Sequence, residues 1–163
     1  MSSEENLMEA FAGESQANRK YLAFAKKADE EGYDQIANLF RAAAAAETVH
    51  AHNHLEIVGG IKNTKENLDA AIKGETEEFT DMYPNFIAEA KAEKDDAAVW
   101  TFTVANKVEQ IHAVLYQKAL ENIENTPEVD YYVCALCGNT VENDVPEKCP
   151  ICGAENSEFM KID

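Results

Sequence analysis

The chain has 163 residues, of which 45% are hydrophobic, so it is long enough for one ordinary core or for one core plus a small module. Acidic residues outnumber basic ones 31 to 14, and the net charge of -17 disfavours nucleic-acid binding because it repels phosphates. We see no signal peptide and no apolar run of the roughly 20 residues that span a bilayer, so we predict a cytoplasmic protein without membrane association.

The first half of the chain predicts two long helices, because apolar side chains recur there at spacings of three and four. The first helix is expected at 4–31, where Gly32 ends the pattern. The second is expected at 34–58, and the Gly59-Gly60 pair ends it.

Two further helices are expected before the sequence changes character. One is predicted at 65–93, with Thr64 as its N-cap, and Pro84 inside it should kink it. The other is predicted at 96–124, with an aspartate at 95 or 96 as its N-cap. Four helices with one apolar stripe each favour a mainly α fold built on a four-helix bundle.

Glutamates interrupt these stripes near the middle of every predicted helix. Burying an unpaired carboxylate is costly, and several carboxylates at one level of a bundle would repel each other. Divalent cations would remove both penalties, and oxygen ligands with a few imidazoles suit iron or manganese. The sequence therefore predicts a metal site inside the bundle.

The spacing of these residues supports a site for two metals. Two E-x-x-H pairs occur on different helices, and a separation of three places both members of a pair on one helix face. The other two helices contribute only glutamates, a combination typical of di-iron carboxylate bundles. The usual alternative is a solvated acidic face, but all these positions fall on apolar stripes. The predicted ligands are Glu14, Glu47, His50, Glu75, Glu78, Glu109 and His112.

A second region begins after Thr126-Pro127, where short Val/Tyr segments and Gly turns replace the helical pattern. We expect domains at 1–126 and 130–163. The second has the spacing C-x2-C-x11-C-x2-C, which predicts tetrahedral thiolate ligation of one metal. Spacing does not choose between iron and zinc, but so short a segment needs a metal for stability. The predicted ligands of this four-cysteine site are Cys134, Cys137, Cys149 and Cys152.

With these residues assembled, the chain resembles the rubrerythrins along nearly its full length. The matching stretches are FAGESQANRKYLAFA, NLFRAAAAAETVHAHNH, IKGETEEFTDMYP, KVEQIHAVLY and YYVCALCG with CPICG. Their joint presence in this order makes the resemblance specific. It implies a ferritin-like di-iron bundle followed by a small rubredoxin-like β module, with one iron in the four-cysteine site.

The resemblance also implies a role for each carboxylate ligand. Glu14 and Glu75 would be terminal ligands on opposite irons. Glu47 and Glu109 would bridge the two irons.

The remaining ligands would differ between the two irons. His112 would bind one iron. Glu78 would hold the other iron when it is oxidised, and His50 would hold it when it is reduced. Zinc could substitute for iron in the four-cysteine site.

The implied function is a non-haem di-iron peroxidase that reduces hydrogen peroxide to water in oxidative-stress defence. Electrons would pass from an external donor protein or reductase through the iron of the four-cysteine site. The alternative on the same di-iron site is a ferroxidase or oxygen reductase. A different class is a non-catalytic zinc-ribbon protein whose bundle mediates association.

Chain geometry adds an expectation about assembly. The stretch 60–66 between the second and third helices spans about 23 Å when extended. A return along the bundle to a parallel third helix needs roughly 30 Å. We therefore expect a homodimer in which the first two helices pack with the last two of another chain.

Overall fold

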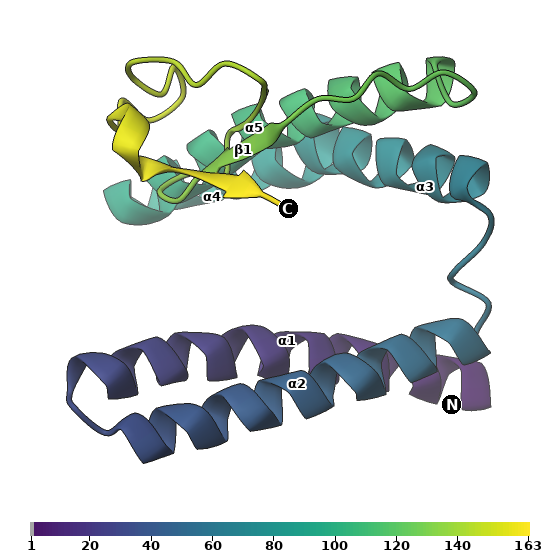
Figure 1. Ribbon diagram of the computed structural model, residues 1–163, viewed down its shortest axis with the longest axis vertical. Coiled ribbons are helices and arrows are strands. Elements are labelled where there is room, and N and C mark those ends of the chain that lie inside the picture. The colour runs from purple at the N-terminus through teal and green to yellow at the C-terminus, as the bar shows by residue number, and fades with distance from the viewer. Residues whose placement is uncertain (1) are drawn as a thin grey trace. The chain divides into compact units, whose positions relative to one another are not determined.

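The computed structural model describes residues 2–163, which fold into two compact units that divide between Lys62 and Asn63. The first unit is a helical hairpin, α1 (Ser3–Glu30) and α2 (Asp34–Ile57) (Figure 1). Small buried side chains, among them Ala25, Ala37 and Ala44, let the two helices pack closely. Gly32, with φ of +79°, supplies the left-handed residue in the short turn between them.

The second unit begins with a helical stretch that is not uniformly α-helical. It consists of α3 (Thr64–Glu77), the π-helical turn η1 (Glu78–Met82) and α4 (Tyr83–Glu93). The sequence predicted one helix here, with a kink at Pro84. The structure instead places the wide turn directly before that proline, whose missing N–H and bulky ring disrupt a regular α-helix.

Helix caps set the other boundaries of the second unit. The predicted N-cap Thr64 is wrong, because Asn63 takes that place and its Oδ1 accepts a hydrogen bond from the Glu66 N–H at 3.0 Å. Asparagine is the stronger N-cap residue. Asp95 caps α5 (Asp96–Glu121), as predicted, through the Ala98 N–H at 3.0 Å. This helix ends three residues before the predicted limit of 124.

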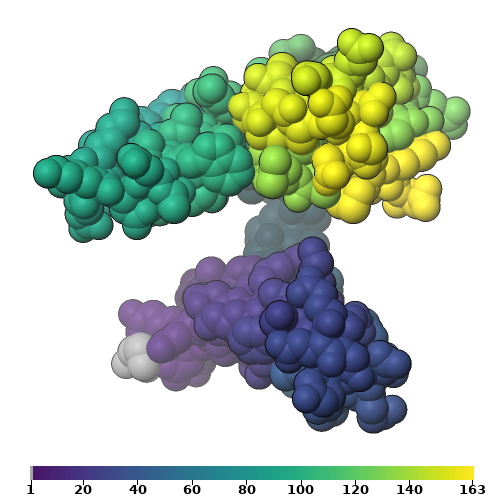
Figure 2. Space-filling view, turned by 90° about the vertical axis from the view of Figure 1, so that its left-hand side faces the viewer, coloured from purple at the N-terminus to yellow at the C-terminus, as the bar shows by residue number. Residues whose placement is uncertain are grey.

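The C-terminal module is a small antiparallel sheet in the order β2-β1-β3. Its strands are β1 (Tyr131–Cys134), β2 (Thr140–Glu142) and β3 (Phe159–Ile162), with a short 3₁₀ turn η2 (Asn156–Glu158) before the last. The module contacts α5 through β2 in the same unit. Figure 2 shows the module in yellow and light green. Within residues 2–163, no helix is long and apolar enough to cross a membrane.

Candidate metal centres

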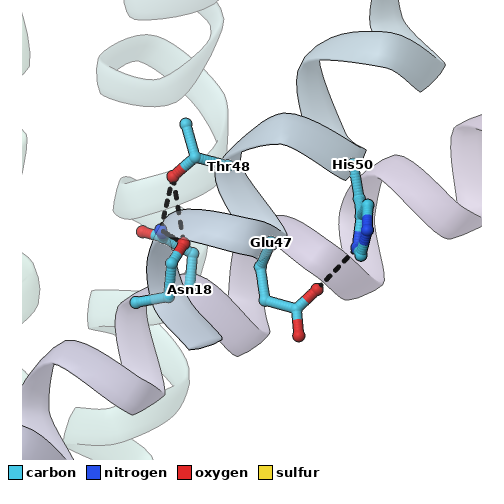
Figure 3. Close-up of polar contacts among 5 residues, drawn as sticks. Asn18, Glu47, Thr48 and His50 are labelled. Carbon is cyan, nitrogen blue, oxygen red and sulfur yellow. Dashed lines mark hydrogen bonds and ion pairs between the residues drawn. The ribbon is translucent and has the colours of Figure 1, made fainter. Parts of the chain in front are cut away.

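The first candidate centre lies in the helical hairpin. It consists of Glu14 on α1 with Glu47 and His50 on α2, and one ligand atom from each lies within 4.8 Å of the others. His50 Nδ1 is 3.0 Å from Glu47 Oε2, and the two side chains point toward each other (Figure 3). Hydrogen bonds with His50 and Glu14 lower the pKa of Glu47, so this carboxylate is ionised and ready to bind a cation.

A polar clamp centred on the buried Asn18 lies beside this triad and fixes the two helices against each other. Asn18 Nδ2 donates to the Ala44 carbonyl at 2.7 Å. It also donates to Thr48 Oγ1 at 2.8 Å (Figure 3). Asn18 lies one turn after Glu14, and Thr48 follows Glu47. The clamp therefore sets the register that brings the two glutamates together.

The second candidate centre lies between α3 and α5. Its members are Glu75, Glu109 and His112, again with ligand atoms within 4.8 Å of one another. His112 Nδ1 is 2.8 Å from Glu109 Oε2 and 3.7 Å from Glu75 Oε1. Burial, together with the nearby Glu109 carboxylate, raises the pKa of Glu75 to about 7. The two carboxylates thus hold a proton that a metal ion could replace.

Two more groups belong to the surroundings of the second triad. Burial and the Glu109 carboxylate also raise the pKa of Glu78, which lies close by but outside the three-residue cluster. Burial and the charges of Glu109, Glu78 and Glu75 raise the pKa of the Tyr83 phenol. Tyr83 was not predicted from the sequence, because it follows Glu78 by five residues. Residues at that spacing lie on different faces of an α-helix, but a π-helical turn places them on the same face.

The third candidate centre is formed by the four cysteines. Cys134 Sγ is 3.8 Å from Cys152 Sγ, and Cys137 Sγ is 3.6 Å from Cys149 Sγ. Sulfurs that bind one metal tetrahedrally at about 2.3 Å lie about 3.8 Å apart, so these thiols already match such a site.

Two similar knuckles hold the cysteines in place. In each, the glycine after the second cysteine has a positive φ, +83° at Gly138 and +81° at Gly153. The Gly138 N–H bonds to the Cys134 carbonyl and the Gly153 N–H bonds to the Cys149 carbonyl, both at 2.8 Å. A side chain with a Cβ would strain either turn.

The thiols differ in acidity. Burial raises the pKa of Cys137. Burial also acts on Cys149, but hydrogen bonds from the backbone N–H groups of Cys152 and Ile151 outweigh it and lower the pKa of that thiol to about 7. Asn139, which is only 1% exposed, adds a further donor, with its Nδ2 3.6 Å from Cys149 Sγ. Hydrogen bonds of this kind stabilise a thiolate ligand.

The structure thus gathers ten of the eleven predicted ligands into three clusters. Glu78 is the exception, although it lies close enough to Glu109 for the charge of that carboxylate to raise its pKa. Each helical unit contributes two carboxylates and one imidazole, which suits a hard or borderline divalent metal such as iron. The cysteine cluster suits a softer tetrahedral site.

Comparison with known proteins gives matches along nearly the whole chain. The family model described as "Rubrerythrin" matches residues 5–120, and the model described as "Rubrerythrin, rubredoxin-like domain" matches residues 132–160. Nigerythrin from Nitratidesulfovibrio vulgaris is 39% identical, over 95% of this chain and 84% of that protein. A rubrerythrin from Porphyromonas gingivalis is 37% identical, over 96% of this chain and 88% of that protein.

Solved structures give the same result. The structure titled "Fully reduced state of nigerythrin (all ferrous)" covers 99% of this chain and 87% of its own, with a TM-score of 0.61 and 37% identity. A partially reduced state of nigerythrin matches equally well, with a TM-score of 0.61. These likenesses confirm the predicted fold class, mainly α with a small C-terminal module that carries four cysteines.

Proposed function

The chain belongs to the rubrerythrin family, and from this premise we propose that it is a non-haem di-iron peroxidase. Membership supports an iron-binding oxidoreductase with a rubredoxin-like domain. We propose that the reaction is the reduction of hydrogen peroxide to water in oxidative-stress defence. Because a four-cysteine thiolate site forms under reducing conditions, we also propose a cytoplasmic location.

The observation that carries the proposal is the pair of matching triads. Glu14, Glu47 and His50 form one, and Glu75, Glu109 and His112 form the other. We propose that the two triads, with Glu78, hold two irons, as the family resemblance implies. As the resemblance implies, His50 and Glu78 would exchange as ligands of one of these irons. The cysteines would hold a third iron, for which zinc is a substitute.

Two ferrous ions held by the two triads and Glu78 would supply the two electrons needed to cleave the O–O bond of peroxide, and two protons would complete two water molecules. The residues of the chain orient the metals and provide protons. The Tyr83 phenol is protonated at neutral pH, as tyrosine ordinarily is, and it lies close enough to Glu75 and Glu109 for their charges to raise its pKa. It is therefore the candidate proton donor. An external donor protein or reductase returns electrons through the four-cysteine site.

A comparison of oxidants tests the reaction. The natively purified protein should contain iron and be coloured by its ferric four-cysteine site. With a reductase system, turnover with hydrogen peroxide should exceed turnover with O₂ or with added ferrous ion. Faster turnover with O₂ or ferrous ion would instead identify an oxygen reductase or ferroxidase. Colourless protein with zinc alone would identify the non-catalytic class.

The linker between the units supports a swapped homodimer. Seven Cα steps from Ile57 to Thr64 reach at most about 25 Å. The Gly60 N–H bonds back to the Leu55 carbonyl at 2.9 Å, which shortens that reach. Ten residues separate Glu47 from the end of α2 and eleven separate Glu75 from the start of α3. If α2 and α3 of one chain ran parallel with their triads at the same level, the linker would have to run back along both of these helix segments, a distance of about 32 Å. The linker is too short for that, so we propose that the two triads of one site come from different chains.

Metal binding by the second triad should weaken as the pH falls below about 7. A metal ion must displace the proton of Glu75, whose pKa is raised to about 7, so the apparent affinity should fall up to about tenfold per pH unit below that value. Calorimetric titration with Mn²⁺ in buffers of different ionisation enthalpy measures the proton release. We expect about one proton near pH 6 and none above about pH 8.

Replacing the exposed Glu66 by glutamine should leave this pH dependence unchanged, since that residue lies at the start of α3, far along the helix from Glu75. An affinity that stays constant between about pH 5.5 and 7 would show that Glu75 does not hold the proton.

The reduction potential of the iron in the four-cysteine site should fall in Asn139→Leu. The Asn139 amide donates toward Cys149 Sγ, and the more negative, reduced site gains more from a donor than the oxidised site does. A hydrogen bond of about 1 kcal/mol corresponds to about 40 mV for a one-electron couple. Spectroelectrochemical titration at the iron–thiolate absorption band measures the shift. Asn156→Leu, an exposed change in the same module, is the matched control, and an equal shift in both variants would contradict this role.

A further inference from the structure

The four-cysteine module contacts a predicted di-iron ligand directly. His112 on α5 has its Nε2 atom 2.9 Å from the Oγ1 atom of Thr140, the first residue of β2. Its other nitrogen, Nδ1, faces the carboxylates of Glu109 and Glu75. One imidazole therefore joins the carboxylate triad to the cysteine module.

The hydrogen-bond partners of Thr140 determine which nitrogen of His112 carries a proton. Thr140 Oγ1 lies 3.2 Å from the Gly138 carbonyl, which can only accept, so both contacts of the hydroxyl are hydrogen bonds when its single proton goes to that carbonyl. The hydroxyl must then accept a hydrogen bond from His112 Nε2–H. This tautomer leaves the Nδ1 lone pair facing the two carboxylates, where a metal ligand needs it.

The position of Thr140 is in turn set by the cysteine knuckle and by its contacts with α5. Gly138 follows Cys137 and lies against Val108, which is one turn before His112. A Cβ atom on Gly138 would be 3.8 Å from Val108 Cγ1. Beyond Thr140, Glu142 forms an ion pair with Lys118, farther along α5. Contacts on both sides therefore hold the hydroxyl opposite the imidazole.

We propose that Thr140 is a positioning residue, through which the four-cysteine module holds His112 in the tautomer and orientation that a metal ion requires. This inference rests on the proposed di-iron site. It makes the two metal centres interdependent, because an intact knuckle favours metal binding at the triad and, reciprocally, a filled triad stabilises the docked knuckle.

The experiment uses the full chain with zinc in the four-cysteine site and Mn²⁺ as the probe of the carboxylate site. Mn²⁺ prefers oxygen and nitrogen ligands and does not compete for thiolates. The dissociation constant is measured from the loss of the free-ion EPR signal. Thr140→Val, which keeps the shape but removes the hydroxyl, should raise it about 10-fold to 100-fold, the usual effect of losing an outer partner of a ligand. Thr140→Ser should stay near the unmodified chain.

Two further measurements separate positioning from simple loosening of the module. Lys118→Met removes the ion pair with Glu142 but leaves the hydroxyl in place, so its dissociation constant should change much less than that of Thr140→Val. Nitrogen-15 shifts of labelled histidine should show the Nε2–H tautomer for His112 in the unmodified and serine chains, and a loss of that preference in the valine chain.

The outcomes distinguish this inference from the function on which it rests. Equal Mn²⁺ affinity in the unmodified and valine chains would overturn the role of Thr140 and leave the di-iron proposal standing. Loss of affinity in the serine or methionine chain as large as in the valine chain would also overturn it. An unmodified chain that takes up neither Mn²⁺ nor ferrous ion at the carboxylates would overturn the proposed function and this inference together.

Discussion

Cys149→Ser is expected to abolish steady-state reduction of hydrogen peroxide while leaving one oxidation of the ferrous-loaded carboxylate site intact. Cys149 has the thiol pKa lowered to about 7, and it lies 3.6 Å from Cys137 in the thiol cluster. Without its thiolate the fourth ligand of the relay site is lost, so electrons cannot return to the oxidised irons. Stopped-flow mixing with peroxide measures the first oxidation, and coupled oxidation of the reductase measures turnover.

The serine variant alone does not separate electron relay from the folding of the module, because the knuckle also positions Thr140. Zinc in the four-cysteine site provides the control, since zinc keeps the tetrahedral thiolate cluster but has no redox chemistry. The zinc-loaded chain, with iron at the carboxylates, should also oxidise once and then stop. If it continues to turn over at the normal rate with the reductase, the relay role of the cysteine centre is wrong.

The parts of the site that are predictable from sequence depend on short-range geometry. Glu47 and His50, like Glu109 and His112, lie three residues apart, and any α-helix places such pairs on one face. The structure accordingly has both pairs within 3.0 Å. The cysteine knuckles are similarly local, because two residues and a glycine define each turn. Most helix limits also follow local signals. The exceptions are Asn63 in place of Thr64 as a cap, the π-helical turn before Pro84 and the early end of α5 at Glu121.

The parts that could not be predicted depend on departures from regular geometry or on contacts distant in sequence. Tyr83 reaches the carboxylates through a π-helical turn, and α-helical spacing does not predict its proximity to Glu78. Thr140 and His112 are 28 residues apart, and no sequence pattern links the two. The same holds for Asn139, whose burial beside Cys149 depends on how the knuckle folds.

The number of residues in the linker between α2 and α3 limits its reach, and this limit is the basis of the proposed swapped homodimer. The homodimer can be tested with a pair of variants. Glu47→Ala damages the triad of the first unit, and Glu109→Ala damages the triad of the second unit. Each variant alone should be inactive, since every site then lacks one of its predicted carboxylate ligands. Refolded together, the two variants should recover activity if sites are shared between chains. In a mixed swapped dimer, one site carries both changes and the other carries none.

Random pairing makes half of the dimers mixed, so about a quarter of all sites should be intact and about a quarter of the unmodified activity should return. A pair with both changes in the first unit, Glu14→Ala with Glu47→Ala, is the matched control, because every swapped or unswapped site then keeps one damaged triad. Different affinity tags on the two chains show that mixed dimers have formed. If tagged mixed dimers of Glu47→Ala and Glu109→Ala stay inactive, each site is built from one chain. The linker would then have to connect α2 and α3 around the same site, and the swapped dimer would be wrong.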